Sequence, residues 1–158
     1  MKFIRKFNLI LLCIAFVPSI VFADPLTYKV DGETVTVVDC DESASGRLVI
    51  PSSYEDKPVI SIEGYAFNSC SGLTSVTVPD SVTSIGRFAF GYCSNLTSVT
   101  IPDSVTSIGQ DAFWGCSNLL SVTIPDSVTR IENMTFRNCG NLTSVIIGNK
   151  VKSIGRWA

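Results

Sequence analysis

Hydrophobic side chains recur along this sequence with a fixed period of 23 residues. The period is carried by cysteine at Cys70, Cys93, Cys116 and Cys139, by leucine at Leu73, Leu96, Leu119 and Leu142, and by phenylalanine at Phe67, Phe90, Phe113 and Phe136. A unit of this length cannot bury its apolar side alone, so equivalent units stack on one another. The period therefore predicts a repeat solenoid in which identical side chains from successive coils form buried columns.

Each unit also carries the pattern of a short strand. In the stretch LTSVTI, residues 96–101, apolar Val99 and Ile101 alternate with polar Ser98 and Thr100, as in a half-buried strand. Because equivalent strands stack coil upon coil, they are expected to pair in a parallel β-ladder. The outward side of this ladder is a row of hydroxyl side chains, formed by Ser75, Thr77, Ser98, Thr100, Ser121 and Thr123.

The remainder of the unit predicts turns. Pro102 ends the strand, and in the stretch PDS proline fixes φ while the Asp and Ser side chains bond nearby backbone. The stretch SVTSIG, residues 104–109, predicts a second short extended piece that buries its valine and isoleucine. The stretch QDAFWGC, residues 110–116, predicts one helical turn that carries its alanine, phenylalanine and cysteine inward.

The repeat pattern changes at both ends of residues 24–158. The repeats occupy residues 51–158, and residues 24–50 precede them. The first repeat contains an insertion, SSYEDKP, which is either part of a cap or rim or, in the interpretation we favour, a solvated loop. The last stretch, VKSIGRWA, copies VTSIGRFA from an earlier repeat and then stops, so the last repeat is incomplete. This edge predicts either a truncated product or a chain that associates with itself there.

The first 23 residues read as a secretory signal peptide. Lys2, Arg5 and Lys6 precede an apolar run, and Val21-Phe22-Ala23 forms a small-residue cleavage site. The apolar run is shorter than the ~20 residues of a spanning helix, which argues against a membrane anchor. Cleavage removes three cations from a chain whose formal net charge is −2. The acidic mature chain is therefore not expected to bind nucleic acid or anionic membranes.

Catalytic, cofactor-binding and metal-binding residues are not predicted. The sequence contains no histidine, which excludes the usual triads and histidine metal ligands. A 23-residue period places the cysteines in a column of buried thiols, whereas metal ligands converge on a point. Asp80, Asp103 and Asp126 recur in the PDS turns, where local capping explains them. The chain is therefore not expected to be an enzyme.

With LTSVTI followed by IPDSVTSIGQDAFWGCSN, the sequence resembles the BspA-like class of leucine-rich repeat proteins. The resemblance implies a right-handed, β-rich α/β solenoid with a parallel ladder and short helical or irregular turns. It also implies that residues 24–50 form a β-rich N-terminal cap. It also implies a secreted or cell-surface location. The expected role is adhesion or recognition of host, matrix or other cell-surface proteins, without catalysis.

Candidate ligand-binding residues are sought where the repeats differ, because the core does not dictate those positions. The stretch before each cysteine varies from RFAFGYC to QDAFWGC and NMTFRNC. It is expected to expose Arg87, Phe88, Tyr92, Gln110, Asp111, Trp114, Met134 and Arg137. Among these, Phe88, Tyr92, Trp114 and Arg137 are of the types that anchor protein interfaces. The hydroxyl row is the second candidate surface, and a structural spacer or self-associating array is the alternative function.

Overall fold

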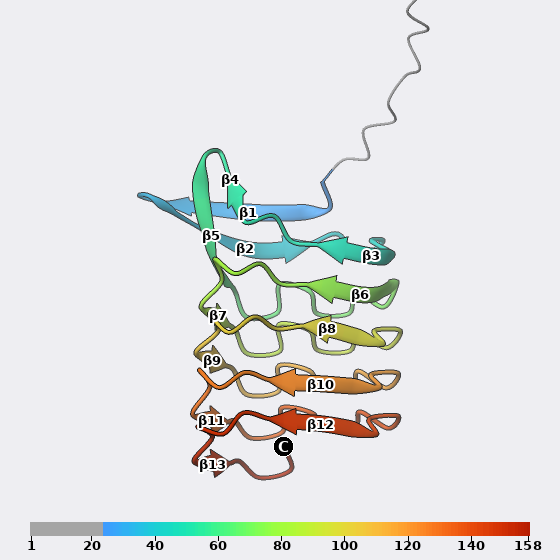
Figure 1. Cartoon of the computed structure of the whole chain (residues 1–158). Coiled ribbons are helices and arrows are strands. Elements are labelled where there is room, and N and C mark those ends of the chain that lie inside the picture. Colours follow the sequence, from blue (N-terminus) through green and yellow to red (C-terminus); the bar gives the residue numbers. More distant parts are fainter. Residues whose placement is uncertain (1–23) are drawn as a thin grey trace, which may run out of the picture.

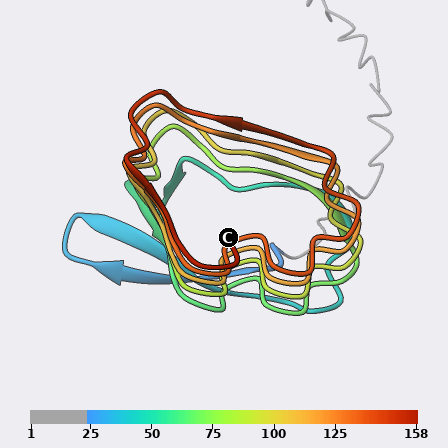
Figure 2. The same cartoon turned by 90° about the horizontal axis from the view of Figure 1, so that it is seen from below.

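The computed structural model describes residues 24–158, which form a solenoid of stacked coils (Figure 1). The predicted signal peptide, residues 1–23, lies outside the described residues. Seen along the stack, successive coils follow nearly the same outline around a common interior (Figure 2). Every regular element of residues 24–158 is a strand. Accordingly, this part of the chain holds no helix of the length and apolarity needed to span a bilayer.

The predicted parallel ladder is a long sheet to which successive coils each contribute one strand. Its strands, in the order β12-β10-β8-β6-β3, are β3 (Gly46–Val49), β6 (Leu73–Thr77), β8 (Ser98–Thr100), β10 (Ser121–Ile124) and β12 (Ser144–Ile147). The register pairs Val76 with Val99 and Thr77 with Thr100. Identical side chains are thus cross-strand neighbours, with the valines buried and the hydroxyl groups outside.

A second row of strands lines another side of each coil. One sheet holds β1 (Leu26–Asp31), β2 (Thr34–Cys40), β5 (Lys57–Ile62), β7 (Ser84–Ile85) and β9 (Ser107–Ile108), and a second pairs β11 (Arg130–Ile131) with β13 (Ser153–Ile154). The strands β7 and β9 confirm the predicted second extended piece, and Ile85 and Ile108 are buried in it.

The PDS turns join the two rows of strands and also tie neighbouring coils together. The Val105 N–H donates to the Pro102 carbonyl at 3.1 Å, which closes the turn. The Ser104 hydroxyl donates to the Val82 carbonyl at 2.7 Å. Val82 belongs to the preceding coil, so this serine bonds between coils as well as sitting in a local turn. The exposed Asp103 lies in the turn, where it was expected.

The stretch from residue 110 to residue 116 forms a series of tight turns, and the predicted helical turn is wrong. The Ala112 N–H donates to the Gly109 carbonyl at 3.3 Å, whereas the next N–H, of Phe113, donates to Thr135 at 2.9 Å. Thr135 belongs to the following coil. Successive N–H groups of the turn therefore alternate between hydrogen bonds within their own coil and hydrogen bonds to the next coil. A helix would bond only within its own coil. The inward placement is confirmed, since Ala112 and Phe113 are fully buried.

Two antiparallel hairpins lie at the N-terminal end of the stack. One pairs β1 with β2, and the other pairs β4 (Ser53–Tyr54) with β5 (Figure 1). The second hairpin contains the insertion SSYEDKP. Most of the insertion is exposed, as expected of a solvated loop, but residues 53–58 pair as a short hairpin. Glu55 and Asp56 make its turn with positive φ angles of 50° and 60°. Tyr54 stacks on Tyr28 of β1, with ring centroids 4.2 Å apart, so the insertion contacts β1.

The core consists of the predicted columns. Phe67, Phe90, Phe113 and Phe136 stack in sequence, with centroid separations of 4.9, 5.2 and 5.5 Å. The first three rings are fully buried. Phe136, the last ring of the column, is half-buried. Stacked aromatic rings at this spacing add to the free energy gained from burial. The repeated phenylalanine therefore ties each coil to the next.

Candidate binding surface

The hydroxyl row lies on the outer face of the long sheet, as predicted. Ser98, Thr100, Ser121 and Thr123 are exposed, whereas Ser75 and Thr77 are half-buried. The row ends in aliphatic residues, because Val49 in β3 and Ile146 in β12 take the place of the threonine. The structure thus brings the six predicted residues together into one even surface of small side chains. It offers hydrogen-bonding groups but no large anchor.

A second surface gathers the larger candidates on the tight-turn side of the coils. We call it the aromatic stripe and define it as Tyr65, Phe88, Tyr92, Trp114, Arg137 and Trp157. The Phe88 ring stacks on Tyr65 at 5.2 Å and on Trp114 at 5.4 Å between centroids. Tyr92 stacks on Trp114 at 6.2 Å. The side chains come from successive coils, so stacking of the coils builds the stripe.

Arg137 is the cation of the stripe. Its guanidinium lies 5.3 Å from the Trp114 ring centroid and 5.3 Å from that of Trp157. An arginine held between two aromatic faces loses little conformational freedom on binding and keeps outward N–H donors. Arg137 is exposed, as are Tyr92 and Trp157, while Trp114 and Phe88 are half-buried beneath them. In the stripe, half-buried aromatic rings therefore hold side chains whose hydrogen-bond donors are exposed to a partner.

The backbone of the tight turns directs these side chains outward. Phe88 and Tyr92 have positive φ angles of 54° and 59°, and Trp157 has 54°. Such angles are unusual for bulky residues, and they persist only where surrounding contacts fix them. Here hydrogen bonds between coils supply that support. The Phe88 N–H donates to the Gln110 carbonyl at 3.2 Å, and the Tyr92 N–H donates to the Trp114 carbonyl at 2.7 Å.

One residue predicted to be exposed is buried. Asp111 has only 1% of its surface exposed, and its Oδ2 accepts from the Arg87 guanidinium at 3.3 Å. Its other oxygen, Oδ1, is buried without a hydrogen-bond partner. Asp111 stands at the repeat position of Phe88, and its partner Arg87 lies over the Phe88 ring, 5.2 Å from the centroid. The variable position is therefore a support of the stripe and no part of its outer surface.

Sequence reasoning missed two members of the stripe. Tyr65 and Trp157 stand at the repeat position of Phe88, one period before it and three periods after it. Both are exposed, with 53% and 66% of their surface accessible. The signal that identifies them is the period itself, applied to Phe88 as it was applied to the core. Gln110 and Met134, which were also predicted to be exposed, are half-buried.

The cysteine column consists of free thiols in the described residues, as predicted. The thiols of Cys93, Cys116 and Cys139 point to the carbonyl of the phenylalanine 26 positions earlier, at 3.0, 3.0 and 3.1 Å. Each thiol thus serves as a weak donor between coils. Burial raises the pKa of Cys93 to about 12, so its thiol stays protonated at neutral pH. Residues 24–158 contain no cluster of three potential metal ligands.

Native protein is expected to resist alkylation at Cys93 and Cys116, because only the thiolate reacts and both thiols are fully buried and have a raised pKa. In denaturant without reductant, mass spectrometry should show iodoacetamide on all five cysteines that follow residue 23. Two or fewer alkylated cysteines would mean that disulfides form, and would contradict the column of free thiols.

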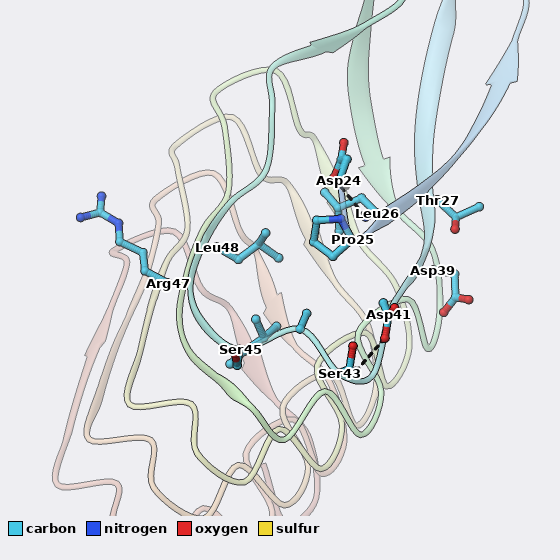
Figure 3. A pocket seen from close by; sticks show the side chains of 12 residues that line it. Asp24, Pro25, Leu26, Thr27, Asp39, Asp41, Ser43, Ser45, Arg47 and Leu48 are labelled. Atoms are coloured by element: carbon cyan, nitrogen blue, oxygen red, sulfur yellow. Dashed lines mark hydrogen bonds between the residues drawn. The ribbon is translucent and has the colours of Figure 1, made fainter. Parts of the chain in front are cut away.

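A cavity of about 930 Å³ opens at the N-terminal end of the stack (Figure 3). Leu26, Leu48 and Leu73 form its apolar lining, and Asp24, Asp39 and Asp41 are the acidic residues around it. The side chain and backbone of Ser43 hydrogen-bond the Asp41 carboxylate and lower its pKa. Sequence reasoning did not identify this cavity, because the hairpin β1–β2 that borders it lies outside the repeat.

Comparisons with known proteins match this geometry. Residues 48–158 fit the family model of the BspA type leucine rich repeat region in six copies. A leucine-rich repeat protein from Bacteroides capillosus is 36% identical and superposes with a TM-score of 0.69 over 80% of this chain and 96% of that chain. A leucine rich cell surface protein from Faecalibacterium prausnitzii is 28% identical, with a TM-score of 0.60 over 82% of this chain and 43% of that chain.

The pneumococcal vaccine antigen PcpA shares the fold at 22% identity, with a TM-score of 0.71 over 84% of this chain and 33% of that chain. No curated protein matches the sequence. The solved structures thus agree with the repeat solenoid that the period predicted and with the leucine-rich repeat class that the sequence resembles.

Proposed function

This chain belongs to the BspA-type leucine-rich repeat family, and from that membership we propose that it is a non-catalytic module that binds proteins. The proposal places it outside the cell that makes it, secreted or at the cell surface, where it mediates adhesion to host, matrix or other cell-surface proteins. The predicted signal peptide supports export, and a 28% identical relative is described as a cell surface protein.

The aromatic stripe is the observation that carries this proposal. Tryptophan, tyrosine and arginine dominate the energetics of protein interfaces, and here they lie side by side across successive coils. Arg137 is already held between Trp114 and Trp157, so a partner carboxylate meets a preorganised donor. The hydroxyl row lacks such anchors and is assigned the smaller share of the binding energy.

The absence of catalysis is part of the proposal and has its own support. The chain has no histidine, and Asp80, Asp103 and Asp126 are distributed one to a coil in the PDS turns. Carboxylates that cooperate in acid–base chemistry have to face one another across a substrate. The repeat instead displays them as a row along the outside of the stack.

Binding is tested with the mature chain on immobilised matrix proteins and on intact cells. Saturable binding is expected, and Arg137→Ala should weaken it by at least about 30-fold, equivalent to about 2 kcal/mol, as for an interface anchor. Trp114→Ala should have an effect of similar size. Because Arg137 is exposed, its loss should leave the melting temperature nearly unchanged.

Thr100→Ala, on the hydroxyl row, is the matched control and should change the affinity by no more than about twofold. The assignment to the stripe is wrong if Thr100→Ala weakens binding while Arg137→Ala does not. The proposed function itself is wrong if the folded mature chain shows no saturable binding to any of these surfaces.

Self-association is the second candidate function, and the C-terminal edge favours it. Ile146, Ile154 and Trp157 expose 61%, 60% and 66% of their surface there, and β12 and β13 each have one unpaired edge within the described residues. Unpaired edges with apolar side chains promote strand pairing between molecules. Light scattering across a dilution series decides the matter, because a constant monomer mass excludes self-association.

A further inference from the structure

We propose that the free edge of β3 binds an extended, basic peptide segment of a partner protein, which adds to the long sheet as a further strand. The site is the N-terminal cavity, about 930 Å³ in volume, and not the aromatic stripe. The two surfaces use different residues, so this proposal and the proposed function can fail separately.

The long sheet has a vacant strand position at its N-terminal end. The coil that contains β2 contributes no strand to this sheet, because the chain before β2 folds back as β1 and pairs antiparallel with it. Among residues 24–158, β3 pairs only with β6. Its outer edge therefore presents backbone groups without strand partners, which is the usual template for adding a peptide strand.

The cavity beside this edge provides an apolar floor. Leu26, Leu48 and Leu73 line it, and Leu48 extends into the space between β3 and the start of β1 (Figure 3). In the ladder below, Val76 is the register partner of Leu48 on the inner side. A valine at the equivalent position of an added strand would cover Leu48 from above, as Val76 does from below.

Charge selects the kind of peptide. Asp24, Asp39 and Asp41 line the cavity and are all exposed, with Arg47 as the cation opposite them. Residues 24–63 as a whole contain nine acidic and three basic side chains. An added strand with lysine or arginine at its ends would be attracted to this rim, whereas an acidic strand would be repelled.

The repeat itself indicates which sequence fits, because the stretch LTSVTI occupies the equivalent position in another coil. The probe is therefore a fluorescent peptide KLTSVTIK, titrated with the mature chain, residues 24–158, at low ionic strength. Saturable binding is expected from the rise in anisotropy. The charge-reversed peptide ELTSVTIE should bind at least tenfold more weakly. KLTSPTIK should not bind, because proline removes the central backbone donor.

Variants of the protein locate the contact. Asp39→Asn combined with Asp41→Asn should lower the affinity for KLTSVTIK several-fold and reduce its advantage over ELTSVTIE. Asp103→Asn, an exposed carboxylate in a PDS turn away from the cavity, is the matched control and should have no effect. Trp114→Ala should also leave peptide binding intact, which separates this site from the aromatic stripe.

Amide chemical shifts complete the test. On addition of KLTSVTIK, the amides of Arg47, Leu48 and Val49 should shift, while those of Ser144–Ile147 in β12 should not. The proposal is wrong if the peptide fails to bind at millimolar concentration. It is equally wrong if ELTSVTIE or KLTSPTIK binds as well as KLTSVTIK, or if the shifts appear at β12.

Discussion

Phe113→Ser is expected to lower the free energy of unfolding by about 4 kcal/mol, and the melting temperature by about 10 to 15 °C. Phe113 is fully buried and stacks on Phe90 on one side and Phe136 on the other. The substitution removes both stacks, leaves a cavity between two coils and introduces a hydroxyl group into apolar surroundings. No other ring can replace the contact, because the neighbouring rings are fixed in their own coils.

Thermal unfolding followed by circular dichroism measures this effect. Phe136→Ser is the matched control and should cost less, since Phe136 is half-buried and lies near the end of the column. An unchanged melting temperature for Phe113→Ser would show that the ring is not buried in the folded protein. If both variants lost the same free energy of unfolding, Phe136 would be buried as fully as Phe113, contrary to the structure.

Arg87→Ala should destabilise the fold by about 2 kcal/mol, the second largest loss of stability expected. The Arg87 side chain is 57% exposed, but its partner Asp111 is 1% exposed and has a second oxygen without a partner. Removing the arginine leaves a buried carboxylate with no cation. The loss lies between the 3–5 kcal/mol typical of fully buried pairs and the 0–1 kcal/mol of exposed pairs, because water reaches the arginine.

Arg130→Ala tests whether burial or distance decides the strength of an ion pair. The Arg130–Glu132 contact is shorter, at 2.9 Å against 3.3 Å, but its side chains are 55% and 36% exposed. We expect Arg130→Ala to cost less than about 1 kcal/mol in urea unfolding. A larger loss for Arg130→Ala than for Arg87→Ala would show that the buried carboxylate of Asp111 is not the dominant factor.

The columns of the core could be predicted from the period alone, and the reason is geometric. Once coils stack in register, a residue such as Phe90 has the residue 23 positions later as its neighbour, whatever the local backbone does. The valine and hydroxyl rows of the ladder follow from the same rule combined with strand alternation. These features need no knowledge of the turns between them.

The tight turns could not be predicted in this way, because their stability comes from the neighbouring coil. The stretch QDAFWGC is short and has no glycine before Gly115 to indicate a left-handed residue. Its Asp111 has a φ of 59°, and the Phe88 and Tyr92 of the preceding coil have similar angles. Local propensity favours neither bulky residue there, and the inter-coil hydrogen bonds of the turn override it.

The candidate surface was predicted in part for a related reason. Variation between repeats identified Phe88, Trp114 and Arg137, which the structure brings together. It also identified Asp111 as exposed, because variation was equated with exposure. A variable position can be buried when a residue of an adjacent coil compensates for it, as Arg87 does for Asp111. The cavity at the N-terminal end has no counterpart in the repeat and left no periodic signal.

The central claim is that side chains 23 residues apart stack as continuous columns, and an experimental electron-density map of residues 24–158 tests it most directly. The rings of Phe67, Phe90, Phe113 and Phe136 should form one stack, with Phe90 and Phe113 centroids close to 5.2 Å apart. A map in which Phe90 and Phe113 lie in separate parts of the molecule, or in which either ring faces solvent, would contradict the account.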